Sequence, residues 1–390
     1  MNKNLLKGAL FGAMALVSPA LHAGDDKTVI VTLENLSPAD GAFLTPVWVG
    51  LHDGSFDIYD RDAPASGGLE RLAEDGNTGP LSEMFSHSDE EGMQATIASN
   101  GAIPPLAPGE KVSHAFQVDS DDQRYFSYAS MVIPSNDAFI ANGDPKAHPL
   151  FDDKDRFIGR SFLVKGSAVL DAGTEVNDEE PANTAFLGQA APDTGDVEGG
   201  VVTSHPGFQA GGNILSAFPG ADFTAEGSYL LRVTLRCVEQ NRTSEARGIL
   251  DPVQEVSVQP VDSDGTGTAR IRFKTGSDNI RYWITIRRLS SDVVGAHFHL
   301  GSCNENGPVI VNITDEVSSR KGTVRINGRI EAEDVIGPLA SGDQSLMALI
   351  GEMMSGNTYI NIHTEKYPAG EVRAQVRPQF RNSASKRGED

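Results

Sequence analysis

Short runs in which apolar and polar residues alternate recur along the whole chain, and they constrain its fold more than any other feature. Clear examples are residues 28–33, 112–118, 269–273 and 323–330. Alternation with a period of two gives a strand one face for a core and one for solvent. Helical spacing is brief and occurs at residues 69–73, 81–85, 332–339 and 345–354. We therefore predict an all-β chain of two tandem antiparallel β-sandwich domains with a few short helices.

The acidic residues gather in the first part of the chain, which indicates a domain boundary. The formal net charge is -22, and nearly all of it falls in residues 1–240. A step in charge of this kind marks a boundary between domains. The predicted order is a signal peptide 1–23, a first domain 28–238, a linker 239–252, a second domain 253–378 and a disordered tail 379–390. The charge argues against nucleic acid or anionic lipid as the main partner.

The amino terminus has the pattern of a secretory signal. Lys3 and Lys7 precede an apolar run over 8–17, and small residues lead to Ala23. The run is shorter than the roughly 20 residues that a membrane-spanning helix needs. We expect cleavage after Ala23, no membrane span, and a mature protein in the periplasm, at the cell surface or in the medium.

Two acidic residues of the first domain are spaced to share a cation. Asp171 and Glu175 flank Gly173, so that a tight turn can bring both carboxylates together. Carboxylates that meet raise each other's pKa unless a cation neutralises them. Calcium prefers such oxygen ligands, and it is abundant outside the cell. The spacing also fits a solvated acidic loop, so it leaves both interpretations open.

The first domain resembles a spondin domain, the amino-terminal module of F-spondin. The resemblance rests on His52-Asp53-Gly54, Ala65-Ser66 with Leu72-Ala73-Glu74, Met131 with Pro134-Ser135-Asn136-Asp137, and Asp171-Ala172-Gly173-Thr174-Glu175. That family implies a β-sandwich with a bound calcium ion. Its ligand positions fall on Asp137, Asp171 and Glu175, and the last departs from the family's aspartate. The resemblance therefore implies calcium at these three carboxylates.

Three histidines of the second domain are predicted to point away from its core. In the run 293–300, Phe298 and its apolar neighbours share one face, which leaves His297 and His299 on the other. The same alternation over 359–363 places His363 outward. A His-x-His pair with a third histidine is a candidate site for copper or zinc. Histidines bonded to adjacent strands, or simply exposed, are the ordinary alternatives, and they also fit the pattern.

The second domain resembles the CHRD domain, the module named from chordin. The resemblance rests on Gly295-Ala296-His297-Phe298-His299, Asn306-Gly307-Pro308-Val309, the run 356–364, and Pro368-Ala369-Gly370-Glu371-Val372-Arg373. It implies an all-β fold and a binding or matrix role without catalysis. The His-x-His strand is also similar to that of copper–zinc superoxide dismutase. The further metal ligands of that enzyme have no counterpart in the chain.

Cysteine placement and missing motifs complete the expectations. Cys237 and Cys303 are the two cysteines of the chain. Export favours a disulfide between them that would join the domains, and two unpaired thiols are the alternative. There is no nucleophile elbow, phosphate-binding loop or His-Glu-x-x-His helix. We expect a calcium-binding, non-catalytic adhesion or matrix-type protein whose partner is an extracellular or cell-surface protein or glycan. The alternative is a copper or zinc redox protein that uses the three histidines.

Overall fold

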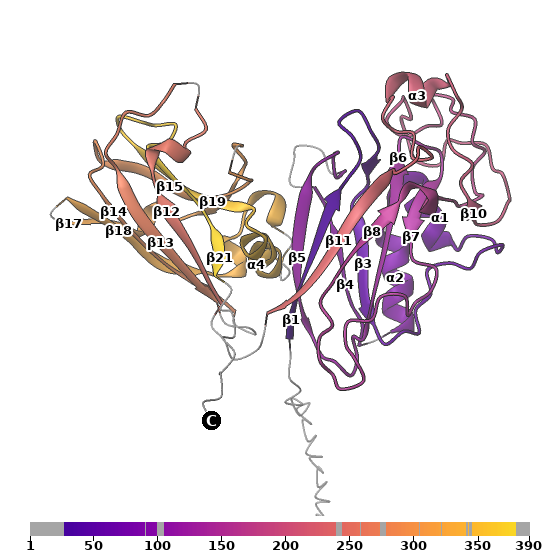
Figure 1. Cartoon of the computed structure of the whole chain (residues 1–390), viewed down its shortest axis with the longest axis horizontal. Coiled ribbons are helices and arrows are strands. Elements are labelled where there is room, and N and C mark those ends of the chain that lie inside the picture. The colour runs from indigo at the N-terminus through magenta and orange to yellow at the C-terminus, as the bar shows by residue number, and fades with distance from the viewer. Residues whose placement is uncertain are drawn as a thin grey trace, which may run out of the picture.

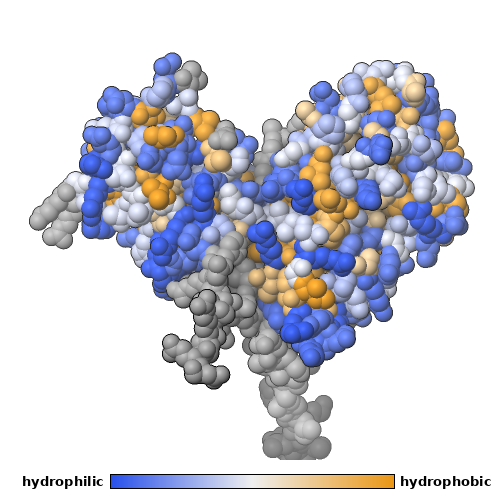
Figure 2. All heavy atoms as spheres, viewed as in Figure 1, coloured by the Kyte–Doolittle hydropathy of each residue, from blue (hydrophilic) through white to orange (hydrophobic). Residues whose placement is uncertain are grey.

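The computed structural model of the chain confirms the predicted all-β architecture, with two lobes of antiparallel sheet side by side (Figure 1). It describes residues 27–89, 91–99, 105–238, 244–257, 259–273, 278–303, 305–320, 322–340, 342 and 345–379. The predicted signal peptide and all but the first residue of the predicted tail lie outside these ranges. From the side shown in Figure 2, the surface of both lobes is mainly hydrophilic, with separate apolar patches.

The first domain has two sheets that pack face to face. One has the strand order β5-β1-β11-β8, formed by Lys111–Val118, Lys27–Asn35, Tyr229–Val238 and Arg160–Lys165. The other has the order β10-β9-β7-β6-β3-β4, formed by Thr203–Ser204, Leu170–Asp171, Ala138–Ala141, Tyr125–Ile133, Val47–His52 and Met93–Ile97. Strand β2 (Phe43–Leu44) pairs with β6. The core between the sheets includes Val31, Leu51, Phe116 and Val233.

Two helices add a third layer over the second of these sheets. Helices α1 (Gly67–Asp75) and α2 (Gly79–Ser88) bury Leu69, Leu72 and Phe85 against Trp48 of β3. Strand β3 is therefore buried on both faces. The start and end of α1 follow from local chemistry: the Ser66 hydroxyl accepts a bond from the Leu69 amide, and Gly76 takes the left-handed conformation at the other end. Helix α3 (Asn213–Ala217) is a single short turn.

The second domain is also a pair of sheets. One has the order β17-β18-β14-β13-β12-β21, formed by Val317–Arg320, Thr323–Ile330, Ile280–Arg287, Thr266–Phe273, Ser244–Leu250 and Arg377–Gln379. The other has the order β16-β15-β19-β20, formed by Val309–Asn312, Val293–Leu300, Thr358–Thr364 and Val372–Gln375. Their inner faces share a core that includes Ile271, Ile284, Phe298 and Ile360.

Two sequence expectations need correction here. The range predicted as a linker, 239–252, contains strand β12 and the start of a 3-10 turn at Pro252–Gln254. Strand β12 pairs with β13, because Ala246, Gly248 and Leu250 supply a buried face. Residues 239–243 lie outside the described ranges. The helical spacing at 332–339 gives two 3-10 turns, Ala332–Asp334 and Gly337–Leu339, because Gly337 with a φ of 68° interrupts it.

Helix α4 (Ser345–Ser355) joins the two domains. It is buried on nearly every side and lies between the lobes (Figure 1). Ile30 and Ala115 of the first domain belong to the same apolar cluster as its Leu349 and Met353. A helix that is apolar all round needs cover on all sides, and β1 and β5 of the first domain provide the missing part.

Polar contacts fix the position of α4 against the first domain. The Ser113 amide of β5 donates to the Glu352 carboxylate. The Ser355 hydroxyl lies 2.6 Å from that of Ser113 and 3.1 Å from that of Thr32. Hydrogen bonds to a buried charged group, such as this carboxylate, are among the stronger ones in proteins. The two domains are therefore held together by both apolar and polar contacts.

His148 of the first domain is expected to make the fold sensitive to acid. Its ring stacks on Phe162 with centroids 3.9 Å apart, and burial lowers its pKa to about 4. The unfolded chain takes up this proton near the ordinary pKa of about 6.5, so stability is lost as the pH falls from 6.5 to 4. We expect this loss to be about 2–3 kcal/mol.

The variant His148→Phe tests this expectation, because it keeps an aromatic ring on Phe162 and removes the titrating group. Urea unfolding at pH 7.5, where the ring is neutral in both states, measures the packing effect of the substitution alone. Below pH 6.5 the variant should lose less stability than the native protein. An identical pH dependence of the two proteins would contradict the assignment.

Candidate metal centres

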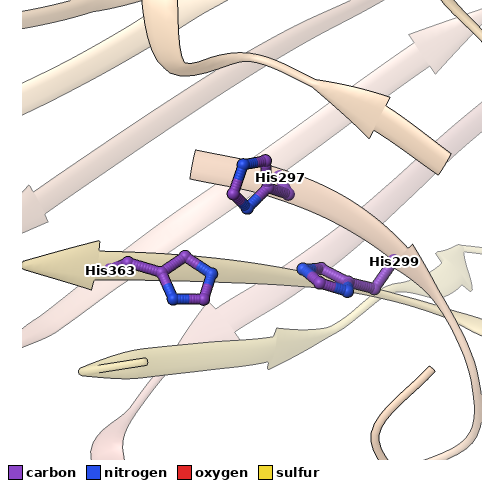
Figure 3. A group of neighbouring side chains, drawn as sticks. All are labelled: His297, His299 and His363. Carbon is purple, nitrogen blue, oxygen red and sulfur yellow. The ribbon is translucent and has the colours of Figure 1, made fainter. Parts of the chain in front are cut away.

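The three histidines of the second domain converge on one face of its smaller sheet. His297 and His299 lie on β15, and His363 lies on the adjacent strand β19 (Figure 3). Phe298 between the first two is fully buried in the core, so the rings point to the opposite face, as the alternation predicts. One ring nitrogen from each histidine can be chosen so that all three lie within 4.8 Å of one another. The sheet thus gathers three nitrogen ligands at one point.

The hydrogen bonds of two rings determine which nitrogens are available. Nδ1 of His299 lies 3.0 Å from the Gly307 carbonyl oxygen, and Nδ1 of His363 lies 3.0 Å from that of Pro368. A carbonyl oxygen can only accept, so each Nδ1 carries the hydrogen and each Nε2 has a free lone pair. Both Nε2 atoms are buried without a partner, as is Nδ1 of His297. Carbonyl acceptors of this kind orient metal-binding histidines.

The surroundings keep the rings neutral and in place. Burial lowers the pKa of His299 to about 4, and it also lowers the pKa values of His297 and His363. The His299 ring stacks on Tyr359, with centroids 4.8 Å apart and planes 11° apart. Gly295, which lies opposite His363, leaves room: an added methyl would lie 3.2 Å from the His297 ring. Neutral imidazoles with free lone pairs are the form that binds a metal ion.

The acidic region of the first domain is organised around Asp137, which is completely buried. Its Oδ2 accepts bonds from the Thr174 amide and hydroxyl and from the Glu175 amide, at 2.8, 3.2 and 3.1 Å. Its Oδ1 is buried without a partner. Burial and the neighbouring Asp171 raise the pKa of Asp137 to about 6. One oxygen of this carboxylate is thus left for a ligand that the protein itself does not supply.

The other two predicted calcium ligands differ from each other. Asp171 lies on β9 opposite Ala138, and its two oxygens accept from the Gly173 amide and the Asn177 side chain. Glu175 directs Oε1 to the Gly195 amide, while its Oε2 is buried without a partner. Burial raises the pKa of Glu175 to about 7. The three carboxylates are neighbours, but they are not among the groups whose ligand atoms lie within 4.8 Å of one another.

A further acidic group, which the spacing of the sequence did not indicate, lies beside this region. Oxygens of Glu70, Glu74 and Asp193 approach within 4.8 Å of one another. Arg71 of α1 forms ion pairs with both Glu74 and Asp193. An arginine already neutralises this group, so it has less need of a metal ion. It could not be found from sequence because Asp193 lies more than a hundred residues after α1.

The predicted disulfide between Cys237 and Cys303 is not present. Cys237 lies on β11 opposite Val29, whereas Cys303 is exposed in the loop after β15, near Arg373. The contacts between the domains include those of α4 with β5 and β1. The covalent link expected between the domains is replaced by the packed helix.

Comparison with known proteins identifies both domains. Residues 38–144 match the Spondin_N family model, and residues 247–376 match that of the CHRD domain. This confirms the predicted order of domains. Both families are generally non-enzymatic binding domains typical of extracellular proteins. No curated protein sequence matches the chain. No helix among the described residues has the length and hydropathy needed to cross a membrane.

Proposed function

We propose that this chain, a Spondin_N region followed by a CHRD domain, is an exported, non-catalytic binding protein that holds a copper or zinc ion in its second domain. The observation that carries the metal site is the convergence of three neutral imidazoles whose free nitrogens are buried without partners. Burying a polar atom without a partner is unfavourable by about 1–3 kcal/mol. Coordination to a metal ion would give the three ring nitrogens a partner and remove this cost.

The donor set favours particular metals. Three imidazole nitrogens suit Zn²⁺ and Cu²⁺, whereas calcium and magnesium prefer oxygen. His297 and His363 are partly exposed, so solvent or a group from a partner can complete the coordination. Three protein ligands with one open position distinguish such a site from a closed structural one. The proposed role is metal-dependent contact with a partner outside the cell.

Titration calorimetry with Zn²⁺ and with Cu²⁺ tests the proposal. Each of the variants His297→Ala, His299→Ala and His363→Ala should weaken binding by about 100-fold or more, since each removes one of three ligands. His87→Ala, on the exposed face of α2, is the matched control and should bind as the native chain does. Circular dichroism checks that each variant folds. If any one of the three variants keeps native affinity, the three histidines are not the site.

Calcium binding at the first domain is a second candidate. It is supported by the unpaired, buried oxygens of Asp137 and Glu175 and by the raised pKa values of both carboxyls. A calcium ion would neutralise the charges of these two buried carboxylates. Asp137 and Glu175 would be direct ligands, while Asp171 already has donors on both oxygens. Calcium there would stabilise the loops that connect β9 to β10.

A further inference from the structure

The outer face of the larger sheet of the second domain is lined by arginines. Strand pairing places the outward residues in rows across the sheet. In one row Arg272 lies opposite Arg281, which lies opposite Arg329. The next row contains Arg377, Arg247, Arg270 and Trp283. We call this surface the arginine face; its arginines are Arg247, Arg270, Arg272, Arg281, Arg287, Arg325, Arg329 and Arg377.

Few carboxylates balance these charges. Glu245 is the one acidic residue among the outward positions of β12, β13, β14 and β18, and it forms ion pairs with Arg247, Arg270 and Arg272. The remaining arginines of the face have no carboxylate within 4.0 Å among the residues that the structure describes. Arg247 is 61% exposed even while paired. The positive charge of the face is thus available to a ligand.

Without a bound ligand, the adjacent arginines of the arginine face destabilise the folded domain. Like charges directly opposite on neighbouring strands destabilise a sheet, and Arg272, Arg281 and Arg329 are neighbours of this kind. The whole chain is strongly acidic, so a concentration of arginine on one face is not a by-product of composition. An anionic ligand would relieve the repulsion. The charges therefore indicate a binding surface.

The shape of the face favours a long ligand over a small one. Neighbouring strands lie about 4.8 Å apart, and alternate residues along a strand about 6.8 Å apart, so the guanidinium groups form a broad array. A surface hollow of about 880 Å³ continues from it, lined by Arg247, Arg270 and Arg377. Trp283 lies among the arginines and is 39% exposed. An aromatic ring beside cations suits a sugar ring that carries acidic groups.

We propose that the arginine face binds an acidic polysaccharide, one that carries carboxylate or sulfate groups along its chain. Arginine pairs with such groups through two parallel hydrogen bonds. The acidic first domain does not prevent this, because charges more than about 8 Å apart are largely screened at physiological ionic strength. Within that distance the acidic first domain repels an anionic polymer, so we expect no binding there. The inference is independent of the metal proposal, since it uses a different sheet.

The face fits a polysaccharide better than a single-stranded nucleic acid. Surfaces that bind single strands stack successive bases on several aromatic rings. Trp283 is the one aromatic residue among the outward positions of β12, β13, β14 and β18. Both domain families are also typical of extracellular proteins, where acidic polysaccharides are common polymers. The observations therefore favour the polysaccharide, and nucleic acid is an outcome of the test.

Binding of the full chain to immobilised polygalacturonate and to heparin tests the proposal, with neutral dextran as the uncharged polymer. The first probe carries carboxylates and the second sulfates as well, so the pair identifies the preferred anion. We expect binding that weakens steeply with salt and is absent on dextran. The double variant Arg281→Glu/Arg329→Glu should weaken it more than 10-fold, and Trp283→Ala several-fold.

The matched control is Arg61→Glu/Lys154→Glu, which reverses two exposed cations of the first domain and alters the net charge equally. It should bind within twofold of the native chain. Equal losses in both double variants would show that only net charge matters and would overturn the proposal. So would failure of the native chain to bind either acidic polymer at low salt, tighter binding to single-stranded DNA, or self-association that the Arg281→Glu/Arg329→Glu variant abolishes.

Discussion

A single methyl group added at Gly351 is expected to weaken the packing between the two domains. Gly351 lies in the middle of α4, and an added Cβ there would lie 2.8–2.9 Å from backbone atoms of His114 on β5. Backbone cannot move aside as a flexible side chain does, so the helix must shift away from the first domain. Overpacking of this kind destabilises by about 1–3 kcal/mol. Gly351→Ala should therefore lower stability, and the bulkier Gly351→Val should lower it further.

A matched substitution separates this effect from helix propensity. Gly67 in α1 has open space around its Cα, with no heavy atom within 4 Å of an added Cβ. Replacing a helical glycine by alanine normally stabilises by about 0.5–1 kcal/mol. Gly67→Ala should thus raise stability while Gly351→Ala lowers it. If Gly67→Ala stabilises the protein and Gly351→Ala destabilises it, the contact of α4 with β5 is the cause of the destabilisation.

Differential scanning calorimetry measures whether the Gly351 variants still unfold in a single transition. In the native chain Ile30 and Ala115 share a core with α4, so we expect the two domains to unfold together in one transition. Gly351→Val should split this into two transitions, because the domains no longer share a core. A single transition at the native midpoint would contradict the view that α4 couples the domains.

The parts of the fold that face solvent on one side could be predicted from sequence. Strands β13 and β18 alternate core and solvent-facing residues, and the sequence predicts both. Strand β6 could not be found in this way. Its nine residues are almost all buried, because β6 has the inter-sheet core on one face and the layer under α1 on the other. A strand buried on both faces has no period of two to detect.

The candidate sites, too, are predictable only where the pattern of a single strand determines them. The outward direction of His297 and His299 follows from one strand, but the approach of His363 depends on how β15 pairs with β19, which no local pattern encodes. The arginine face cannot be predicted from the sequence. Its charges are evenly balanced by acidic residues in the second half of the sequence, and only strand pairing shows that they lie on one surface.

Calcium is expected to reverse the effect of one substitution in the first domain. In calcium-free solution at neutral pH, the charge on Asp137 is buried beside Asp171, and its raised pKa of about 6 means that the charge destabilises the folded state. Asp137→Asn removes this charge and keeps an oxygen that can accept the bonds from Thr174 and Glu175. The variant should therefore be more stable than the native chain in a chelator, by about 1–2 kcal/mol.

With calcium at 100 times its dissociation constant, the native chain should gain about 2.7 kcal/mol, because the ion neutralises Asp137 and engages its unpaired Oδ1. The variant lacks this carboxylate and should gain far less, so the order of stability inverts. Urea unfolding of both proteins in chelator and in calcium measures all four values. Asp153→Asn, an exposed change of the same charge, should respond to calcium as the native chain does. Equal responses of Asp137→Asn and the native chain would show that calcium does not bind at Asp137.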